Sequence, residues 1–213
     1  MPRYTPAAVD LPIAPVDPVL TSAVAQVFDL EGKVGRAIDS LGPVDDRDVV
    51  LLDADGGRRQ AELEAMGARV RAIEDLEPAR LPTRSADVIL GYWTGLGLGA
   101  AADEGTLARL ERVLRPDGRL LLVEDYGRDD IRPLYADTAR EARLASASDR
   151  RGPMLAHGFR TRTIHCFWTF ASAEAARALL VALFPETGEQ VAASMTRSRL
   201  EHKVAVFHRT RGE

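Results

Sequence analysis

The sequence predicts an α/β fold with a doubly wound, mostly parallel β-sheet. Two short runs, residues 49–52 and 120–123, are apolar at every position, as strands covered on both faces must be. Acidic residues follow both runs directly, and ligands of open α/β sheets bind beyond the carboxyl ends of the strands. Helix and strand patterns alternate along the chain, which is typical of this fold class.

Residues 105–126 indicate a helix, a turn and a buried strand in that order. Leucines recur at helical spacing, and Pro116 cannot continue a helix, so we expect the helix to end near Arg115. The Asp-Gly pair at residues 117–118 tolerates the backbone angles of a turn. The segment is therefore one half of a helix–strand unit.

The segment 48–74 predicts a strand, a helix and a second strand. The helix includes residues 61–66 and closes at Gly67, and residues 70–73 form a strand that ends at Glu74. Later segments continue the alternation. The further elements that we expect are a strand over residues 87–93, a helix over 131–147, a strand over 160–170, a helix over 174–184 and a final strand over 203–208.

The first part of the chain has a different pattern. Residues 1–17 contain four prolines and little periodicity, which indicates an extended arm. Residues 18–41 keep apolar positions at helical spacing, with Gly32 and Gly35 as the expected break between two helices.

The composition is that of an ordinary globular protein: 213 residues, 46% hydrophobic and 28% charged. The net charge of −4 gives no electrostatic reason to expect nucleic acid or a membrane surface as a partner, so we expect a small-molecule substrate. No apolar run is long enough to cross a bilayer, and the N-terminus lacks the apolar core of a secretory signal, so we expect a cytoplasmic protein. We divide the chain into an arm with cap helices, residues 1–43, and an α/β domain, residues 44–213.

The run RVLRPDGRLLLVE within residues 105–126 resembles the strand-five region of class I S-adenosylmethionine-dependent methyltransferases. The resemblance covers most of the chain after Val44, and it implies a Rossmann-like sheet with S-adenosylmethionine as the cofactor. The C-terminal strand, helix and strand look like the ending of this family, which includes one antiparallel strand. In the family, helices before the first strand help to close the cofactor site; the alternative is that they only cover the sheet edge.

The resemblance implies that the turn after the first strand holds the amino-acid end of the cofactor. The family prefers acid-x-Gly-x-Gly-x-Gly there, because a side chain would occupy the space of the ligand. Here the turn reads Asp-Ala-Asp-Gly-Gly-Arg-Arg, with Asp53 and Gly57 in register. Asp55 and Arg59 replace the first and the last glycine. Gly56 could restore part of the backbone freedom.

Two further acids complete the implied cofactor site. Glu74 ends the second strand, where Rossmann-like proteins bind ribose hydroxyls, although it could also be an exposed acid at a strand end. Glu77 resembles the acid that the family places near the adenine amino group. The family inserts a helix and a strand between these two acids, and the two residues between them here leave no room for either. Either the sheet has lost a strand or one of the two assignments is wrong. We favour a sheet with one strand fewer than the seven of the family and with Glu74 retained.

Tyr92 and Trp93 end the third expected strand, where the family lines the pocket for cofactor or substrate. Their rings could stack on adenine or contact the sulfonium, and core packing is the more common alternative. The glycine-rich residues 91–99 predict a loop that admits a ligand.

Other chemistry has little support in the sequence. The four histidines show no spacing with cysteines or acids that would specify a metal site. Cys166, the single cysteine, lies in an apolar strand and is expected to be a buried, inert thiol. A G-x-G-x-x-G turn after the first strand and a G-x-S-x-G elbow are both missing, which argues against a nicotinamide dehydrogenase and an α/β-hydrolase.

The resemblance thus implies a methyltransferase that acts on a small molecule. A sulfonium is already an activated leaving group, so the reaction depends mainly on alignment, and we assign no catalytic residue. Glu124, Asp125 and Tyr126 are the candidates for contact with the acceptor. The degenerate glycine turn keeps open a catalytically silent methyltransferase fold with a binding or regulatory role. A nucleotide-binding Rossmann enzyme of other chemistry is the third hypothesis.

Overall fold

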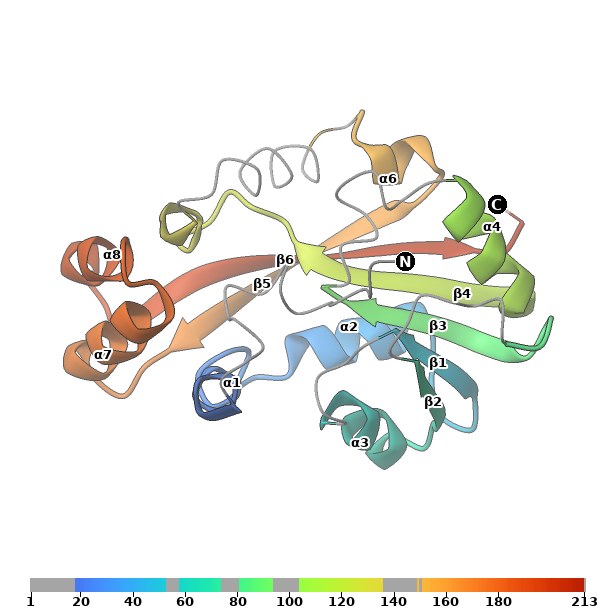
Figure 1. Cartoon of the computed structure of the whole chain (residues 1–213), viewed down its shortest axis with the longest axis horizontal. Coiled ribbons are helices and arrows are strands. Elements are labelled where there is room, and N and C mark those ends of the chain that lie inside the picture. The colour runs from blue at the N-terminus through green and yellow to red at the C-terminus, as the bar shows by residue number, and fades with distance from the viewer. Residues whose placement is uncertain are drawn as a thin grey trace.

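The computed structural model of the protein is built around a β-sheet with the strand order β2-β1-β3-β4-β6-β5 (Figure 1). The structure describes residues 18–52, 58–73, 81–93, 104–135, 149 and 151–212. The strands are β1 (Asp48–Leu52), β2 (Arg69–Ile73), β3 (Ala86–Tyr92), β4 (Leu114–Asp125), β5 (Arg160–Thr169) and β6 (Arg199–Thr210).

The sheet is mostly parallel, as the sequence predicts. β1 pairs in parallel with β2 and β3, and β3 pairs in parallel with β4. Among the described strands only β6 is reversed, because it runs antiparallel to both β4 and β5. With β2 and β5 at its two edges, the described sheet has six strands, as expected.

Helices cover both faces of the sheet, so the fold is doubly wound. Successive residues of β1 pack in different cores. Val49 and Leu51 pack with α2 (Lys33–Leu41) and α3 (Arg58–Ala65), whereas Val50 and Leu52 pack on the side of α4 (Glu104–Val113) and α6 (Pro153–Ala156). This alternation explains why the strand is apolar at every position. The helices are α1 (Pro18–Ala25), α2 (Lys33–Leu41), α3 (Arg58–Ala65), α4 (Glu104–Val113), α6 (Pro153–Ala156), α7 (Ala173–Leu183) and α8 (Gly188–Ser194), with a 3-10 helix η3 (Arg132–Leu134).

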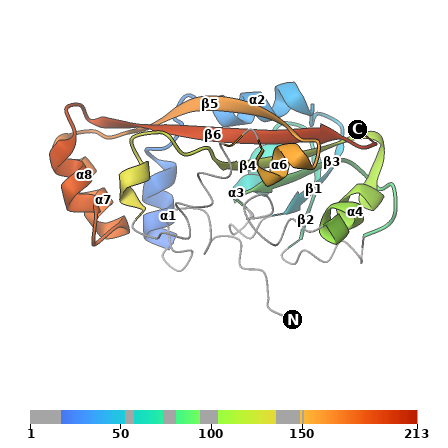
Figure 2. The same ribbon diagram turned by 90° about the horizontal axis from the view of Figure 1, so that it is seen from above.

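A third apolar cluster surrounds the end of the antiparallel β5–β6 pair that lies away from α4 (Figure 2). Trp168 and Leu200 of these strands pack there with residues of α1, α7 and α8. Gly188 begins α8 so close to α7 that a Cβ atom on it would lie 2.2 Å from the Leu180 carbonyl oxygen. The cluster extends the core beyond the parallel part of the sheet.

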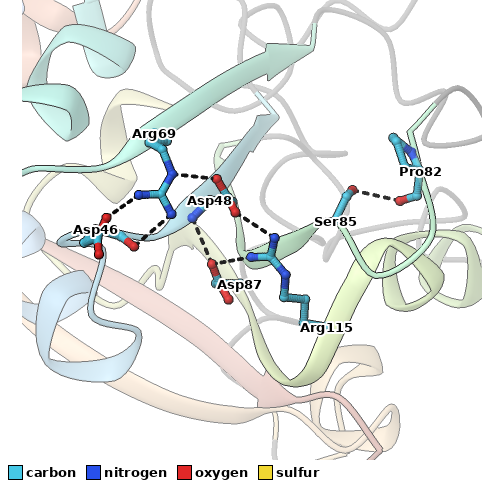
Figure 3. Close-up of polar contacts among 7 residues, drawn as sticks. All are labelled: Asp46, Asp48, Arg69, Pro82, Ser85, Asp87 and Arg115. Carbon is cyan, nitrogen blue, oxygen red and sulfur yellow. Dashed lines mark hydrogen bonds and ion pairs between the residues drawn. The ribbon is translucent and has the colours of Figure 1, made fainter.

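An ion-pair network fixes the amino ends of the parallel strands (Figure 3). Asp48 accepts from Arg69 Nε at 2.8 Å and pairs with Arg115 Nη2 at 2.7 Å. Asp87 Oδ2 accepts from the Asp48 N–H at 2.9 Å and from Arg115 Nη1 at 2.6 Å. Hydrogen bonds from Arg69 and then Arg115 lower the pKa of Asp48 below its ordinary value. The network joins β1, β2, β3 and β4 at the edge opposite the expected ligand site.

Most of the expected elements are confirmed, and the differences have local causes. The helix before β4 ends at Val113 rather than near Arg115, because Leu114 already pairs with Ala86 of β3. The expected turn follows inside β4, where Asp117 has a positive φ of 62°.

Two predictions need correction, and two short helices were not predicted. Gly32, with a φ of 64°, precedes α2 as expected, but Gly35 lies inside α2 and breaks nothing. The helix predicted over residues 131–147 is a 3-10 turn in its described part, because Tyr135 is extended; residues 136–147 lie outside the described residues. The short helices α6 and α8 carry too few residues to show a period. The expected arm, residues 1–17, also lies outside the described part.

Candidate functional site

The ends of β3 and β4 are joined by a buried hydrogen bond at the carboxyl edge of the sheet. Trp93 Nε1 donates to Asp125 Oδ1 at 2.8 Å. The backbone of Trp93 has a positive φ of 49°, which is costly for a bulky residue, and its N–H donates to the Val123 carbonyl at 2.7 Å. Such constrained residues cluster at functional sites, so this edge is the candidate site.

The Asp125 carboxylate is enclosed by donors from three segments. Besides Trp93, His202 of β6 contacts Oδ1 at 2.8 Å through Nε2, and the Tyr135 hydroxyl donates to Oδ2 at 3.2 Å. Asp125 is only 3% exposed and His202 only 1%. A buried carboxylate needs such partners, because an unpaired charge in the interior costs several kcal/mol.

The hydrogen bond from Trp168 determines the tautomer of His202. Trp168 Nε1 lies 3.0 Å from His202 Nδ1, and an indole nitrogen can only donate. His202 Nδ1 is therefore the acceptor, and the proton on Nε2 is donated to Asp125. Both ring nitrogens are engaged, so His202 has no nitrogen with which to move a proton for a substrate.

Phe28, from the segment between α1 and α2, closes this cluster. Its ring centroid lies 5.0 Å from that of His202 and 6.0 Å from that of Trp93. Phe28 also forms a β-bridge with Trp168. The segment before α2 therefore packs directly on the residues at the candidate edge.

Arg59 is a buried cation beside the same edge. Its guanidinium lies 4.3 Å from the ring centroid of Tyr92 and 5.1 Å from that of Trp93, and Nη1 donates to the Tyr92 carbonyl at 3.3 Å. Arg59 is 4% exposed. Arg59, which stands at the last glycine position of the resembled turn, thus makes cation–π contacts with Tyr92 and Trp93.

The two aromatic residues predicted to line the pocket are buried, Tyr92 at 9% and Trp93 at 4% exposed. Both pack in the core with α2 and α3. This is the core-packing alternative, and it brings both rings to the carboxyl edge where the site is expected.

The three acceptor candidates, the last two residues of β4 and the residue after it, face different surroundings. Glu124 is fully buried and pairs in register with Ala205, whose side chain lies in the core on the α4 side. Asp125 takes the opposite face, toward Trp93. Tyr126 is half-buried and packs against the α4-side core. Contact of these residues with an acceptor stays a prediction.

The remaining cofactor candidates lie outside the described residues. These are Asp53, Asp55, Gly56, Gly57, Glu74 and Glu77. The described residues that flank them in the chain are the ends of regular elements: Leu52 ends β1, Ile73 ends β2, and Arg58 begins α3. The residues predicted to hold the cofactor therefore follow adjacent parallel strands.

Sequence reasoning missed His202, Tyr135, Phe28 and the buried position of Arg59. A signal for His202 was present, because Leu200, Val204 and Val206 occupy the same face of β6 and predict burial of the residue between them. Arg59 gave no such signal, since a charged residue early in a helix is normally solvated.

Two further features bear on the chemistry available. Burial raises the pKa of the Cys166 thiol to about 12, so a thiolate is disfavoured. In the described residues no group of three or more histidines, cysteines and acids could hold a metal ion. None of the described helices is long and apolar enough to span a membrane.

The strand order, with one antiparallel strand between β4 and β5, is the mostly parallel arrangement that the sequence predicts. No protein-family model matches the chain, and no curated protein matches it significantly. Among solved structures, the chain is similar to the YcgJ protein from Bacillus subtilis, at 14% identity over 86% of this chain and 99% of that one, with a TM-score of 0.46.

Two other similar structures are named methyltransferases. One is the precorrin-6y C5,15-methyltransferase from Geobacter metallireducens, at 13% identity over 82% of this chain and 85% of that one, with a TM-score of 0.43. The other is the Burkholderia thailandensis 1,6-didemethyltoxoflavin-N1-methyltransferase, solved with 1,6-didemethyltoxoflavin and S-adenosylhomocysteine, at 18% identity over 93% of this chain and 80% of that one, with a TM-score of 0.42.

Proposed function

We propose that this protein binds S-adenosylmethionine and transfers its methyl group to a small-molecule acceptor. The observation that carries the proposal is the switch point of the sheet, where β1 lies between β2 on one side and β3 on the other. In open α/β sheets ligands bind at this point, beyond the carboxyl ends of the strands. In the chain, the residues assigned to the cofactor by resemblance come at the ends of β1, β2 and β3 or within a few residues after them.

The charges at this edge suit the cofactor. Asp53 would hold its amino-acid end, Glu74 would accept the ribose hydroxyls, and Glu77 would lie near adenine. Arg59, two residues after Gly57 in the chain, is a buried cation over the ring of Tyr92 at the end of β3. Bound S-adenosylmethionine supplies a methyl group on a sulfonium, which is an activated leaving group. The protein then has to orient the acceptor and exclude water.

A catalytically silent fold is the second candidate, and Arg59 is the observation that favours it. A buried side chain of this size stands where the family has a glycine, and it already covers the faces of Tyr92 and Trp93. If the side chain cannot move, it takes space from the amino-acid end of the cofactor.

Calorimetric titration with S-adenosylhomocysteine and S-adenosylmethionine distinguishes the two candidates. Saturable binding supports the cofactor site, and no heat with either ligand supports the silent fold. Glu74→Ala should weaken binding by about tenfold or more, because a carboxylate can accept two ribose hydroxyls. Glu77→Ala is the matched control and should weaken binding less. Equal binding by the parent and Glu74→Ala would overturn the assigned ribose role.

Asp55 provides a second test of the same site. A carboxylate in the first glycine position would stand near the cofactor's own carboxylate, and two such charges about 4 Å apart repel by about 4 kcal/mol near a protein surface. Asp55→Gly should therefore tighten the binding of S-adenosylhomocysteine, which lacks the sulfonium charge, more than it tightens the binding of S-adenosylmethionine. If the substitution weakens both ligands, Asp55 binds the amino group of the cofactor instead.

A further inference from the structure

β5 is an edge strand, and part of its outer edge has no strand partner among the described residues. The main-chain groups of Phe167 and Thr169 bond away from β6, to Asp29 and Val27, although β5 pairs with β6 along its whole length. The main-chain groups of the odd-numbered residues therefore point outward, because alternate residues of a strand bond to opposite sides.

The chain itself covers one half of this edge. The Phe167 carbonyl accepts from the Asp29 N–H at 3.0 Å, and the Thr169 N–H donates to the Val27 carbonyl at 2.9 Å. Lys33 Nζ donates to the His165 carbonyl at 3.1 Å.

The other half of the edge is open in the described structure. The outward N–H and C=O groups of Thr161 and Thr163, and the N–H of His165, have no hydrogen bond to described residues. Such groups form a template for another strand.

A groove of about 400 Å³ runs along the open half, between α2 and β5. α2 contributes Lys33, Arg36 and Ala37, and β5 contributes residues 162–165. Figure 2 shows α2 alongside β5 on one side of the molecule. The groove combines an unpaired strand edge with a helix that can contact the side chains of an added strand.

The side chains of the groove are basic. Arg36 donates to the Glu31 carbonyl and Arg162 Nη1 donates to the Ser40 hydroxyl at 3.3 Å, so neither guanidinium has a carboxylate partner in the described structure. Lys33 is already paired with Glu31 at 3.1 Å. The groove therefore offers two uncompensated cations although the protein as a whole carries a net charge of −4.

We propose that the open edge of β5 binds an extended acidic peptide segment of a partner protein by strand addition. In an antiparallel arrangement a partner residue would exchange two hydrogen bonds with Thr163. The next partner residue would stand opposite Arg162, with its side chain on the α2 side of the sheet. An Asp or Glu there lies between the cations of Arg36 and Arg162.

The positive charge near the open edge of β5 also indicates whether a partner protein or a second copy of this chain binds there. Edge-to-edge pairing of two β5 strands about Thr163 would bring together two sets of the same arginines. Like charges on paired strands are destabilising, so the edge favours a partner of opposite charge.

Fluorescence anisotropy with a labelled peptide, Ac-Thr-Val-Glu-Val-Glu-Val-Thr-NH2, tests the proposal on the full chain. We expect saturable binding that R36E/R162E weakens by about tenfold or more, since charge pairs are replaced by repulsion. R71E/R197E is the matched control: it makes the same charge change at two exposed arginines outside the groove and should bind like the parent. Circular dichroism confirms that both variants are folded.

A peptide N-methylated at the valine between the two glutamates separates strand pairing from simple charge attraction. It keeps both acids but loses the N–H that would donate to Thr163, so its binding should be lost. Equal binding of the methylated peptide would overturn strand addition, and so would the absence of binding by the parent peptide. Sedimentation provides the third outcome: a dimer that the peptide dissociates would show that a second copy occupies the edge.

Discussion

The indole nitrogen of Trp93 lies 2.8 Å from Oδ1 of Asp125, and this hydrogen bond joins the ends of β3 and β4 in the interior. Trp93→Phe removes one of the two donors to this oxygen of a buried carboxylate and leaves His202 Nε2 as the other. We expect the free energy of unfolding to fall by about 1–3 kcal/mol, measured by urea denaturation. Tyr135→Phe is the comparison, because its bond to Asp125 is longer, at 3.2 Å, and less buried. A Trp93→Phe protein as stable as the parent would contradict the account of this bond.

The tautomer of His202 can be observed directly. Because Trp168 donates to Nδ1, the proton should reside on Nε2, and long-range ¹H–¹⁵N spectra at neutral pH should show that pattern. In Trp168→Phe the Nδ1 acceptor loses its partner, and the chemical shift of Nδ1 should change. A proton found on Nδ1 of His202 in the parent protein would exclude the hydrogen bond from Trp168 to this nitrogen.

The ion pairs of Asp48 predict a stability difference that depends on pH. Because its folded-state pKa lies below the ordinary value of 3.8, Asp48 stabilises the fold above that pH, and the contribution is lost as the pH falls through the folded-state pKa. Asp48→Asn should be less stable than the parent at neutral pH, and the gap should close in acid. Asp39→Asn, at an exposed position of α2, should show no such gap. A stability difference between the parent and Asp48→Asn that persists in strong acid would refute the stabilising role of the ionised Asp48 carboxylate.

Two glycines should respond in opposite ways to alanine. Gly35 lies inside α2 with nothing within 4 Å of an added Cβ, so Gly35→Ala should raise the free energy of unfolding by about 0.5–1 kcal/mol. At Gly188 an added Cβ would lie 2.2 Å from the Leu180 carbonyl oxygen, so Gly188→Ala should lower the free energy of unfolding by more than about 1 kcal/mol. Thermal denaturation of both variants measures the difference, and equal effects would contradict the close approach of α7 and α8.

The fold could be predicted because its signals are local. The apolar runs of β1 and β4 and the alternation of β5 each specify a strand and the faces that it buries. Gly32 was interpreted correctly, whereas Gly35 was not, because packing of the apolar face of α2 outweighs the low helix propensity of a single glycine.

The site could be predicted only in part. Acids and aromatics at strand ends mark the carboxyl edge, and the structure brings Trp93 and Asp125 together there. The contacts of Asp125 with His202 and Tyr135 join residues that are 77 and 10 positions away in the chain. Such contacts depend on tertiary packing, which one sequence does not specify, and the pairing of Arg59 with two aromatic faces has the same origin.

Thermal unfolding with and without S-adenosylhomocysteine tests the central proposal, a cofactor site beyond β1, β2 and β3, most directly. Ligand at about 100 times its dissociation constant should add roughly 2.7 kcal/mol to the free energy of unfolding and raise the melting temperature of the full chain, whereas NAD should not. An unchanged melting temperature at millimolar S-adenosylhomocysteine would contradict the proposed cofactor site.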